Sequence, residues 1–519
     1  MSVDFGNFAA FAPLLLCMPR TVLVQFDQLH REHGALREAV AGRDRILLVE
    51  SERMTTGRCW HVQRLWFMIS AARHFAAALE AEGLEVDYRK SATTVAGIRE
   101  HLAEFGEREV VTAEASSRRM RASLEAAGVQ TEPNDFFLTS RDEFQAWASS
   151  QKTLVMENFY RRQRVRLGIL VADGKPTGGS WNFDADNRLP PPKGHVYPQP
   201  LSFEPDEIDR QVLAEIEGRR KAHPEDYWGD GPSGVWGTTR AAALAQLDDF
   251  LSNRFENFGP YEDAMPRDSW SVYHSLLSPY MNVGLLHASE VIEAVRVRFQ
   301  QGGVSLASCE GFVRQVIGWR EYINGIYWFF NDSYRESNGL AANRKLLPLY
   351  WNPQATEMNC ARSVVEDLHE RSWVHHIPRL MVLSNLALLT AVNPQEYLDW
   401  MRQTFIDASE WVMVPNVIGM GVHADNGQMM TKPYAAGGAY VNRMSNYCGG
   451  CRFDPKKRTG EDACPLTTLY WDFLDRNREG FARNHRIAQQ VKGLDRLSDL
   501  PEVQARAREV LAKLEAGEL

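Results

Sequence analysis

Residues 21–26 read TVLVQF, and residues 45–50 read RILLVE, each a short apolar run bounded by polar residues. Runs of this length that do not alternate with polar residues are typical of parallel strands buried on both faces. Two similar runs follow at 84–88 and 109–112, and helical patterns separate the four runs at 58–83, 95–105 and 118–127. The alternation predicts an α/β domain with a parallel sheet, a Rossmann-like arrangement in which helices flank the strands.

Polar residues directly follow the first two predicted strands: Asp27 and Gln28 after the first, Glu50 and Ser51 at the end of the second. Ligands of parallel sheets bind at the carboxyl ends of strands, so these four residues are candidate ligand contacts. Helix or turn capping explains Asp27 and Glu50 equally well. The chain contains neither a Gly-x-Gly-x-x-Gly motif nor a phosphate loop, which disfavours an ordinary dinucleotide or NTP site.

The remaining chain divides by its pattern. Residues 136–237 lose the regular period and contain a Gly-Ser-Trp-Asn-Phe-Asp-Ala-Asp-Asn-Arg segment and a proline run at 190–192, as in a connector. Residues 238–519 are helical in period, with short turns rich in Gly, Pro and Asn. We therefore expect four parts, namely an N-terminal extension (1–19), the α/β domain (20–135), a connector (136–237) and an all-α domain (238–519).

Composition restricts the function classes. The chain has 519 residues and a formal net charge of −9, so binding to a polyanion requires a local basic patch. No apolar run approaches the roughly 20 residues of a membrane-spanning helix. The apolar stretch at 8–18 lacks the basic start and cleavage site of a signal peptide. Seven cysteines, an odd number, favour a reducing compartment, and we expect a cytoplasmic monomer.

Three of the seven cysteines lie close together, at Cys448, Cys451 and Cys464, with Pro465 after the last. A Cys-x-x-Cys pair brings two thiols to one side of a turn, within reach of one metal or cluster. Cys360 is a candidate fourth ligand. From these residues alone zinc and an iron–sulfur cluster are about equally favoured, because thiolates suit both, and a redox-active Cys pair is the third reading.

Four motifs stand out in the helical half. They are His274-Ser-Leu-Leu-Ser-Pro-Tyr280, an aromatic-rich segment at 318–328 with Trp319 and Glu321, Val374-His-His-Ile-Pro-Arg-Leu-Met381, and an Asp-Ala segment that starts at Asp407. The hydroxyls and first-turn amides of the first motif suit an anion. Each of the others is compatible with ordinary core packing when taken alone.

In this order and spacing, the motifs and the four cysteines resemble the photolyase/cryptochrome superfamily, specifically its bacterial iron–sulfur branch with (6-4) photolyase activity. The similarity covers essentially the whole chain from residue 20, including the connector motif. It favours a 4Fe-4S cluster over zinc, with Cys360, Cys448, Cys451 and Cys464 as the ligands.

The resemblance implies FAD in the helical domain. Ser275 and Ser278 would face its phosphates, next to His274. Trp319 and Glu321 would lie on the helix that lines the flavin cavity, and Arg379 and Asp407 would flank the isoalloxazine, where the positive charge favours an anionic reduced flavin. In this branch the N-terminal domain carries 6,7-dimethyl-8-ribityllumazine as an antenna, and Asp27, Gln28 and Glu50 would contact it.

The implied activity is light-driven repair of (6-4) lesions in UV-damaged DNA. His376 matches the histidine that faces the lesion, and His375 would support it; an imidazole readily gives and retakes a proton near neutral pH. Trp351 and Trp400 match the relay that carries electrons to the flavin, with Tyr434 and Tyr440 on the cluster side. Core aromatic packing explains these four rings equally well.

Two features depart from the expected pattern. Leu380 occupies the place of a second histidine in eukaryotic (6-4) enzymes, which implies proton transfer by a single histidine. Ser409 and Met413 occupy places where a tyrosine and a carboxylate are expected, and this leaves room for a second hypothesis, a cryptochrome-like photoreceptor with little repair. Repair of cyclobutane dimers and a zinc-stapled nucleic-acid-binding module are the remaining alternatives.

Overall fold

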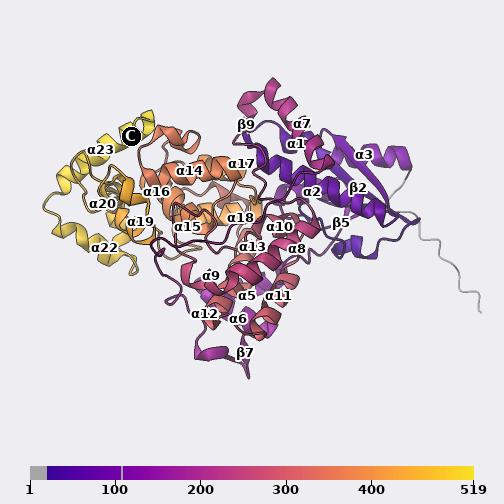
Figure 1. Ribbon diagram of the computed structural model, residues 1–519, viewed down its shortest axis with the longest axis horizontal. Helices are drawn as coiled ribbons and strands as arrows, with labels where there is room; N and C mark the ends of the chain where they lie inside the picture. The colour runs from indigo at the N-terminus through magenta and orange to yellow at the C-terminus, as the bar shows by residue number, and fades with distance from the viewer. Residues whose placement is uncertain (1–19, 107–108) are drawn as a thin grey trace, which may run out of the picture.

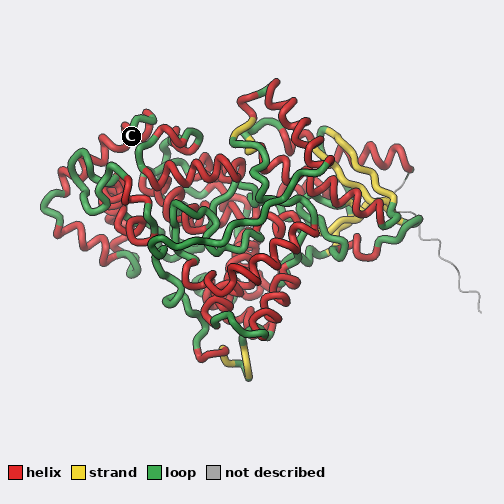
Figure 2. The backbone as a smooth tube through the Cα atoms, viewed as in Figure 1, coloured by secondary structure: helices red, strands yellow, loops and turns green. Residues whose placement is uncertain are grey.

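The computed structural model describes residues 20–106 and 109–519, so the predicted extension at 1–19 lies outside the described residues. A strand-containing part forms one end of the molecule, and helices form the rest (Figure 1). Figure 2 shows the strands of the main sheet gathered at that end, with long loops crossing the middle. The predicted fold class, an α/β region followed by a large helical region, is confirmed.

The main sheet has five parallel strands in the order β4-β2-β1-β5-β6. Its strands are β1 (Arg20–Leu23), β2 (Asp44–Ser51), β4 (Glu85–Ser91), β5 (Val110–Ala113) and β6 (Gln130–Glu132). The first four strands coincide with the four apolar runs. Three helices accompany the sheet: α2 (Val62–Ala81), α3 (Thr94–Phe105) and α4 (Arg118–Ala126).

The two faces of the sheet are buried in different cores. On one face Leu23, Leu47 and Val49 pack with Ile98 of α3 and Leu124 of α4 in a small separate core. On the other face, side chains of β1 and β2 join α2 in the main hydrophobic core, which continues through the helical region. The α/β region is therefore fixed to the helical region by shared apolar burial rather than by a linker alone.

A short parallel sheet unites distant segments at this junction. It pairs β3 (Trp60–His61) with β9 (Tyr227–Trp228). The sequence placed the start of a helix here, at residue 58, whereas α2 begins at Val62. His61 is fully buried, and its Nε2 lies 3.0 Å from the carbonyl oxygens of both Leu368 and His369. A local periodicity cannot reveal such pairing, because its partners are far away in the chain.

The predicted connector is more regular than its sequence pattern suggested. It contains α5 (Arg141–Ser149), α6 (Met156–Leu167) and α7 (Glu207–Ala222), a small hairpin of β7 (Val171–Ala172) and β8 (Lys175–Pro176), and extended chain between them. Asp206 begins α7 and Ser140 begins α5, each through a capping box. Helix α7 packs on α2, while α5 and α6 pack on the helical region.

The helical region has α-helices of three to seventeen residues, counting α1 of the α/β part with them. Their bounds are α1 (Glu52–Thr55), α8 (Arg240–Asp249), α9 (Phe255–Tyr261), α10 (Ser278–Val283), α11 (Ala288–Gln300), α12 (Leu306–Val313), α13 (Glu321–Phe329), α14 (Asn359–Arg371), α15 (His376–Pro378), α16 (Asn385–Leu389), α17 (Pro394–Thr404), α18 (Glu410–Pro415), α19 (Gly438–Met444), α20 (Pro465–Arg476), α21 (Arg478–Ala482), α22 (Ala488–Gly493) and α23 (Leu500–Ala516). A π-helical segment over Arg314–Arg320 joins α12 to α13, and another over Arg379–Ser384 joins α15 to α16. Such π segments often accompany functional sites, because they redirect the side chains around them.

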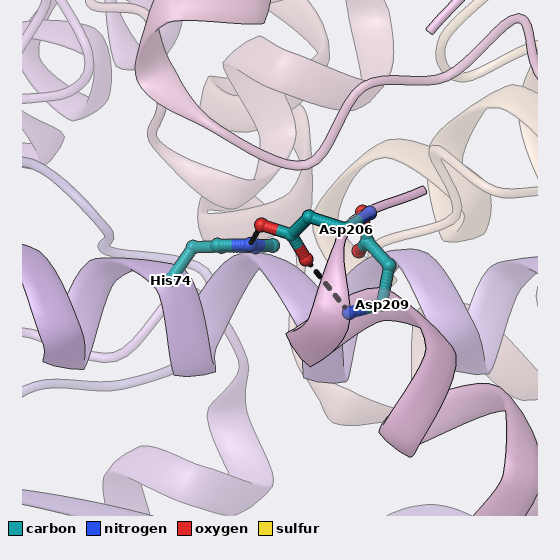
Figure 3. A group of neighbouring side chains, drawn as sticks. All are labelled: His74, Asp206 and Asp209. Carbon is teal, nitrogen blue, oxygen red and sulfur yellow. Dashed lines mark hydrogen bonds and ion pairs between the residues drawn. The ribbon is translucent and has the colours of Figure 1, made fainter. Parts of the chain in front are cut away.

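His74, Asp206 and Asp209 form a compact polar group where α2 meets the start of α7 (Figure 3). The His74 Nε2 lies 2.7 Å from Asp206 Oδ2, and the hydroxyl of Thr238 donates to Asp209 Oδ1 at 2.9 Å. The backbone N–H of Asp209 donates to Asp206 as part of the helix cap. Because the ring nitrogen and both carboxylates already have protein partners, this group serves as a junction between helices.

Among the described helices, none combines the length and the apolar character that crossing a membrane requires.

Candidate functional site

An arginine–aspartate pair lies at the centre of the helical region. Arg379, at the start of the π segment, donates two parallel hydrogen bonds of 2.9 Å to the two carboxylate oxygens of Asp407. Its Nε donates to the carbonyl of Val374 at 2.6 Å. Asp407 also accepts from the hydroxyl of Ser278 at 2.6 Å. The Arg379 guanidinium is thus fixed by Asp407 and by the Val374 carbonyl, and Asp407 is itself fixed by Ser278. Together these hydrogen bonds hold one positive charge at a defined place.

Two of the three candidate histidines stack on each other beside this pair. The rings of His274 and His375 lie 4.1 Å apart and are nearly parallel, and His375 is buried. Desolvation, together with the neighbouring His376, lowers the pKa of His274 to about 3. Desolvation also holds the pKa of His375 well below its ordinary value. Both rings are therefore neutral at physiological pH.

His376 differs from them because its side chain is exposed. Protein atoms nevertheless surround the ring densely, and this desolvation, with the charge of Arg379, lowers the pKa of His376 to about 4. The ring thus combines access to an incoming molecule with a position next to a fixed cation. Of the predicted catalytic pair, His376 is exposed, whereas His375 is buried and stacked on His274.

The environment of Ser275 and Ser278 fits a polar ligand. Ser278 begins α10 and receives the indole N–H of Trp373 at 3.1 Å, while the carbonyl of Ser275 accepts from Gln246 Nε2 at 3.2 Å. Within the described chain, Gln246 Oε1, His274 Nε2 and His375 Nδ1 are buried and have no hydrogen-bond partner. Buried polar atoms are rarely left unpaired in native proteins, so these atoms fit a bound group that supplies the missing partners.

Trp319 and Glu321 have other contacts in the structure. Trp319 lies in the π segment before α13, with its ring against Tyr322. Glu321 is buried, accepts the backbone N–H of Thr139 at 2.8 Å, and pairs with Arg320 at 3.0 Å. Its carboxylate therefore attaches the connector to α13. Within the described chain, the hydrogen bonds, ion pairs and ring contacts of these two residues are with residues other than Arg379 and Asp407.

The four predicted cysteine ligands converge. Cys360 in the first turn of α14, Cys448 and Cys451 in a tight turn, and Cys464 before α20 line one small cavity. All four thiols are free. The other lining side chains are mostly apolar: Met358, Val441, Tyr447, Phe453, Pro465 and Leu466. The backbone N–H groups of Leu466 and Thr467 hydrogen-bond to the sulfur of Cys464.

This donor set fits a thiolate-bound metal centre. Desolvation, together with the neighbouring thiols, raises the pKa of Cys448 to about 12 and holds that of Cys360 well above its ordinary value. Four crowded thiols in an apolar cavity become stable thiolates only when a bound cation compensates their charge. N–H donors to a ligating sulfur are also typical of cluster sites. A Cβ added at Gly438 would lie 2.7 Å from the Cys464 sulfur, so the cavity has no spare room on that side.

Only part of the predicted electron relay forms a contact network. The rings of Trp400 and Trp351 lie 6.5 Å apart, and Trp228, which the sequence did not nominate, lies 5.9 Å beyond Trp351. Tyr440 lies under Arg443, and Tyr434 lies in a charged environment that includes Asp184 and Arg188. Among the described rings, neither tyrosine contacts Trp351 or Trp400.

The candidate antenna residues lie at the carboxyl ends of adjacent strands but have separate partners. Gln28 donates to the carbonyl of Glu114 at 3.0 Å, and burial raises the pKa of Asp27, whose carboxylate bonds to Ser116. Glu50 instead accepts from Arg73 at 2.9 Å and from Tyr88 at 2.8 Å. The hydroxyl of Ser51 donates to Ala92. A ligand at this edge would have to share or displace these bonds.

The positions that depart from the expected motif are all in or next to buried helix. Leu380 and Met413 are buried, and Ser409 precedes α18, where its carbonyl accepts the N–H of Met413. Sequence reasoning missed Trp373, which contacts Ser278. The sequence did contain a signal for this residue, because Trp373 directly precedes the Val-His-His motif.

Comparisons with known proteins agree on one family. Residues 22–228 match the family model described as deoxyribodipyrimidine photo-lyase-related protein. The (6-4) photolyase of Agrobacterium fabrum is 39% identical over 512 residues, which cover 96% of this chain and 100% of that protein. An uncharacterized protein of Acanthamoeba polyphaga mimivirus is 31% identical over 107 residues, 21% of this chain and 80% of its own.

Among solved structures, the crystal structure of a bacterial class III photolyase from Agrobacterium tumefaciens matches with a TM-score of 0.56. The match has 16% sequence identity and covers 98% of this chain and 100% of that chain. At this identity the likeness shows a shared fold.

Proposed function

The chain belongs to the bacterial (6-4) photolyase family, and from that membership we propose that it repairs (6-4) pyrimidine–pyrimidone lesions in UV-damaged DNA by a light-driven reaction. The observation that carries the proposal is the exposed ring of His376 beside the fixed Arg379–Asp407 pair. A site that repairs by electron transfer needs a proton carrier next to the redox group, and His376 would have that position if the flavin binds at the Arg379–Asp407 pair. Nothing in the comparisons favours the photoreceptor alternative.

Family membership implies a flavin, and the donor set fits one. Arg379, Asp407, Ser275, Ser278 and His274 would hold FAD, and the unpartnered atoms next to these residues support the assignment. Reduced FAD, when excited by light, supplies the electron that the lesion receives. Arg379 holds its charge in place through Asp407 and the Val374 carbonyl, and a fixed cation favours the anionic form of a neighbouring reduced group.

His376 would deliver the proton. In the free protein its pKa is about 4, so the ring is neutral at physiological pH and carries one N–H proton. An anionic lesion or a DNA phosphate near the ring raises its pKa, because a negative charge favours the imidazolium form. The charge of the substrate itself would thus convert His376 into an acid at the moment when a proton is needed. His375, buried and stacked on His274, would hold the adjacent backbone in place.

We assign Cys360, Cys448, Cys451 and Cys464 as ligands of a 4Fe-4S cluster rather than zinc. The convergence of four thiols in an apolar cavity supports a thiolate-bound metal centre, and the match to the ligand set of the iron–sulfur branch favours iron. Such a centre would tie α14 to the turn at 448–451 and to α20. It would therefore stabilise the fold in addition to any redox role.

The remaining assignments follow from the same branch. We propose that 6,7-dimethyl-8-ribityllumazine binds as an antenna at the strand ends with Asp27, Gln28 and Glu50. Trp351 and Trp400 would relay electrons to the flavin, supported by their ring separation of 6.5 Å. Tyr434 and Tyr440 remain candidates on the cluster side. We propose a monomer that acts in the cytoplasm and that takes the damaged nucleotide out of the duplex to reach His376.

The test is repair of an oligonucleotide that carries a (6-4) lesion. Chemically reduced, FAD-loaded protein should restore the undamaged bases under blue light and leave them damaged in the dark. His376→Ala should abolish repair while it retains FAD. His223→Ala, which removes an exposed histidine at the end of α7, is the matched control and should repair normally. If the reduced wild type does not repair the lesion in light, the proposed function is wrong.

A further inference from the structure

Three tryptophans that no motif nominated form a closed cluster beside the Arg379–Asp407 pair. We propose that Trp373, Trp236 and Trp270 are a second electron relay to the flavin, separate from Trp400 and Trp351. The proposal rests on the proposed function, because it requires a flavin at the Arg379–Asp407 pair. It adds three redox residues to that site and a second point where electrons enter the protein.

The inner end of the cluster contacts the site directly. The indole N–H of Trp373 donates to the Ser278 hydroxyl at 3.1 Å, and that hydroxyl donates to Asp407 at 2.6 Å. The guanidinium of Arg379 lies 5.7 Å from the centre of the Trp373 ring. Trp373 therefore contacts the arginine–aspartate pair both through its ring and, by way of Ser278, through its indole N–H.

The three rings are spaced for electron transfer. Trp373 lies 5.6 Å from Trp270 and 6.0 Å from Trp236, and the last two are 6.3 Å apart. Tunnelling rates fall steeply with distance, so oxidisable rings in near contact exchange electrons far faster than rings separated by aliphatic core. Trp236 and Trp373 are buried, whereas Trp270 is partly exposed. The cluster thus runs from the interior to solvent.

This route is distinct from the first. Trp400 approaches the site through Phe405, whose ring lies 6.1 Å from Trp400 and 4.3 Å from the Arg379 guanidinium. Trp373 approaches the same guanidinium with its own ring. The two sets therefore meet at Arg379, and among the described rings no direct ring contact joins one set to the other.

The outer end lies beside the edge that carries the cysteines. The loop containing Trp270 pairs with the segment before Cys448: the Met265 N–H donates to the Met444 carbonyl at 2.8 Å, and the Arg267 N–H donates to Asn446 Oδ1 at 2.7 Å. Arg371, from the last turn of α14, covers the Trp270 ring at 5.1 Å and is neutralised by Asp367 at 2.9 Å.

The electrons balance as follows. After photoexcitation of the oxidised flavin, Trp373 gives up one electron to it and takes one from Trp270, directly or through Trp236. Trp270, which is partly exposed, loses its indole proton to water and becomes a neutral radical. A small soluble thiol then returns one hydrogen atom to Trp270, and two thiyl radicals couple to a disulfide. The net change is one electron to the flavin for each thiol oxidised.

The experiment compares photoreduction in four oxidised, FAD-loaded proteins: wild type, Trp400→Phe, Trp270→Phe, and the double variant. Loss of flavin absorption under blue light is followed with dithiothreitol and without oxygen. Trp400→Phe should still photoreduce, and the double variant should not. Trp147→Phe, in which a buried ring of α5 is replaced against Phe144 and Phe159, is the control and should match wild type.

A second readout does not depend on flavin reduction. After illumination of the wild type in air without thiol, peptide mass spectrometry should find oxidised tryptophan at Trp270, and Trp373→Phe should remove that product. The proposal is overturned if Trp400→Phe alone abolishes photoreduction, if the double variant reduces as fast as Trp400→Phe, or if Trp270 stays unmodified in the wild type. Repair by chemically reduced Trp270→Phe should be unchanged, so loss of the relay and loss of the repair function give different results.

Discussion

Gly438 offers a sharp test of the four-cysteine site, because two opposing effects of one methyl group can be compared there. Gly438 is the first residue of α19, where alanine would ordinarily stabilise the helix by up to about 1 kcal/mol. In this structure the added Cβ would lie 2.7 Å from the Cys464 sulfur and 2.9 Å from the Thr467 hydroxyl. Overpacking of this kind costs about 1–3 kcal/mol, so the clash outweighs the gain.

The clash can be relieved in only a few ways, and each one affects the metal. The Cys464 thiol can rotate away, in which case one ligand is lost, or α19 can move, in which case the cavity wall formed by Val441 shifts. Gly438→Ala should therefore contain much less iron and acid-labile sulfide per chain than wild type. Its melting temperature should fall by about 2–4 °C per kcal/mol lost, the usual scale for a large domain.

Gly449→Ala is the matched control. Gly449 lies between Cys448 and Cys451, yet a Cβ at this position meets no atom within 4 Å. This variant should keep full iron and sulfide. Equal loss in both variants would show that the turn tolerates no alanine and would refute the argument from the Cys464 contact. Zinc in place of iron and sulfide in the wild type would refute the assignment of the metal.

Three further predictions concern other residues. Asp407→Asn leaves Arg379 without its charged partner and should lower the free energy of unfolding by about 3–5 kcal/mol, with loss of most of the bound FAD. Asp399→Asn, which breaks a half-exposed pair with Arg335, is the control and should lower it by at most about 1 kcal/mol. Equal melting temperatures of the two variants would contradict this prediction. Glu321→Gln keeps an acceptor for Thr139 and should bind FAD normally, so a flavin-free variant would place Glu321 in the cofactor site. Desolvation lowers the pKa of His61 to about 3, so the unfolded chain binds a proton at this histidine more readily than the folded chain does. The stability that neutral His61 contributes should be fully present above about pH 6.5. Below that pH the free energy of unfolding should decrease by about 1.4 kcal/mol per pH unit. Denaturant midpoints at about pH 7 and about pH 5 should differ less in His61→Gln than in wild type, and an equal difference would be contrary to the assignment.

The sequence predicted the sheet because each strand carries its own local signal. The apolar runs at 21–26 and 45–50 became β1 and β2, and the helices between the strands followed from their periodicity. In the same way, the spacing of Cys448 and Cys451 indicated a shared ligand site from local geometry. Cys360 was a candidate fourth ligand from the sequence, and the family resemblance then assigned it to the same site as the distant cysteine turn.

Long-range polar contacts could not be read from local patterns. Glu321 was predicted to lie on the helix that lines the flavin cavity, and local patterns gave no sign that its carboxylate accepts the N–H of Thr139 in the connector. The helices α5 and α7 lie in a segment whose overall period is weak, although Ser140 and Asp206 supply good caps. The tryptophan cluster likewise joins residues from three separate segments. Tryptophan content alone cannot indicate which indoles meet.

The contact between His61 and the end of α14 has a consequence for the order of events during synthesis. The imidazole that begins α2 is bonded to the carbonyls of Leu368 and His369, which leave the ribosome some three hundred residues later. Until then one end of α2 lacks these partners. The α/β part is thus an early but incomplete folding unit, and the late arrival of α14 completes it. A fragment that ends before α14 should remain vulnerable to proteases near residue 60.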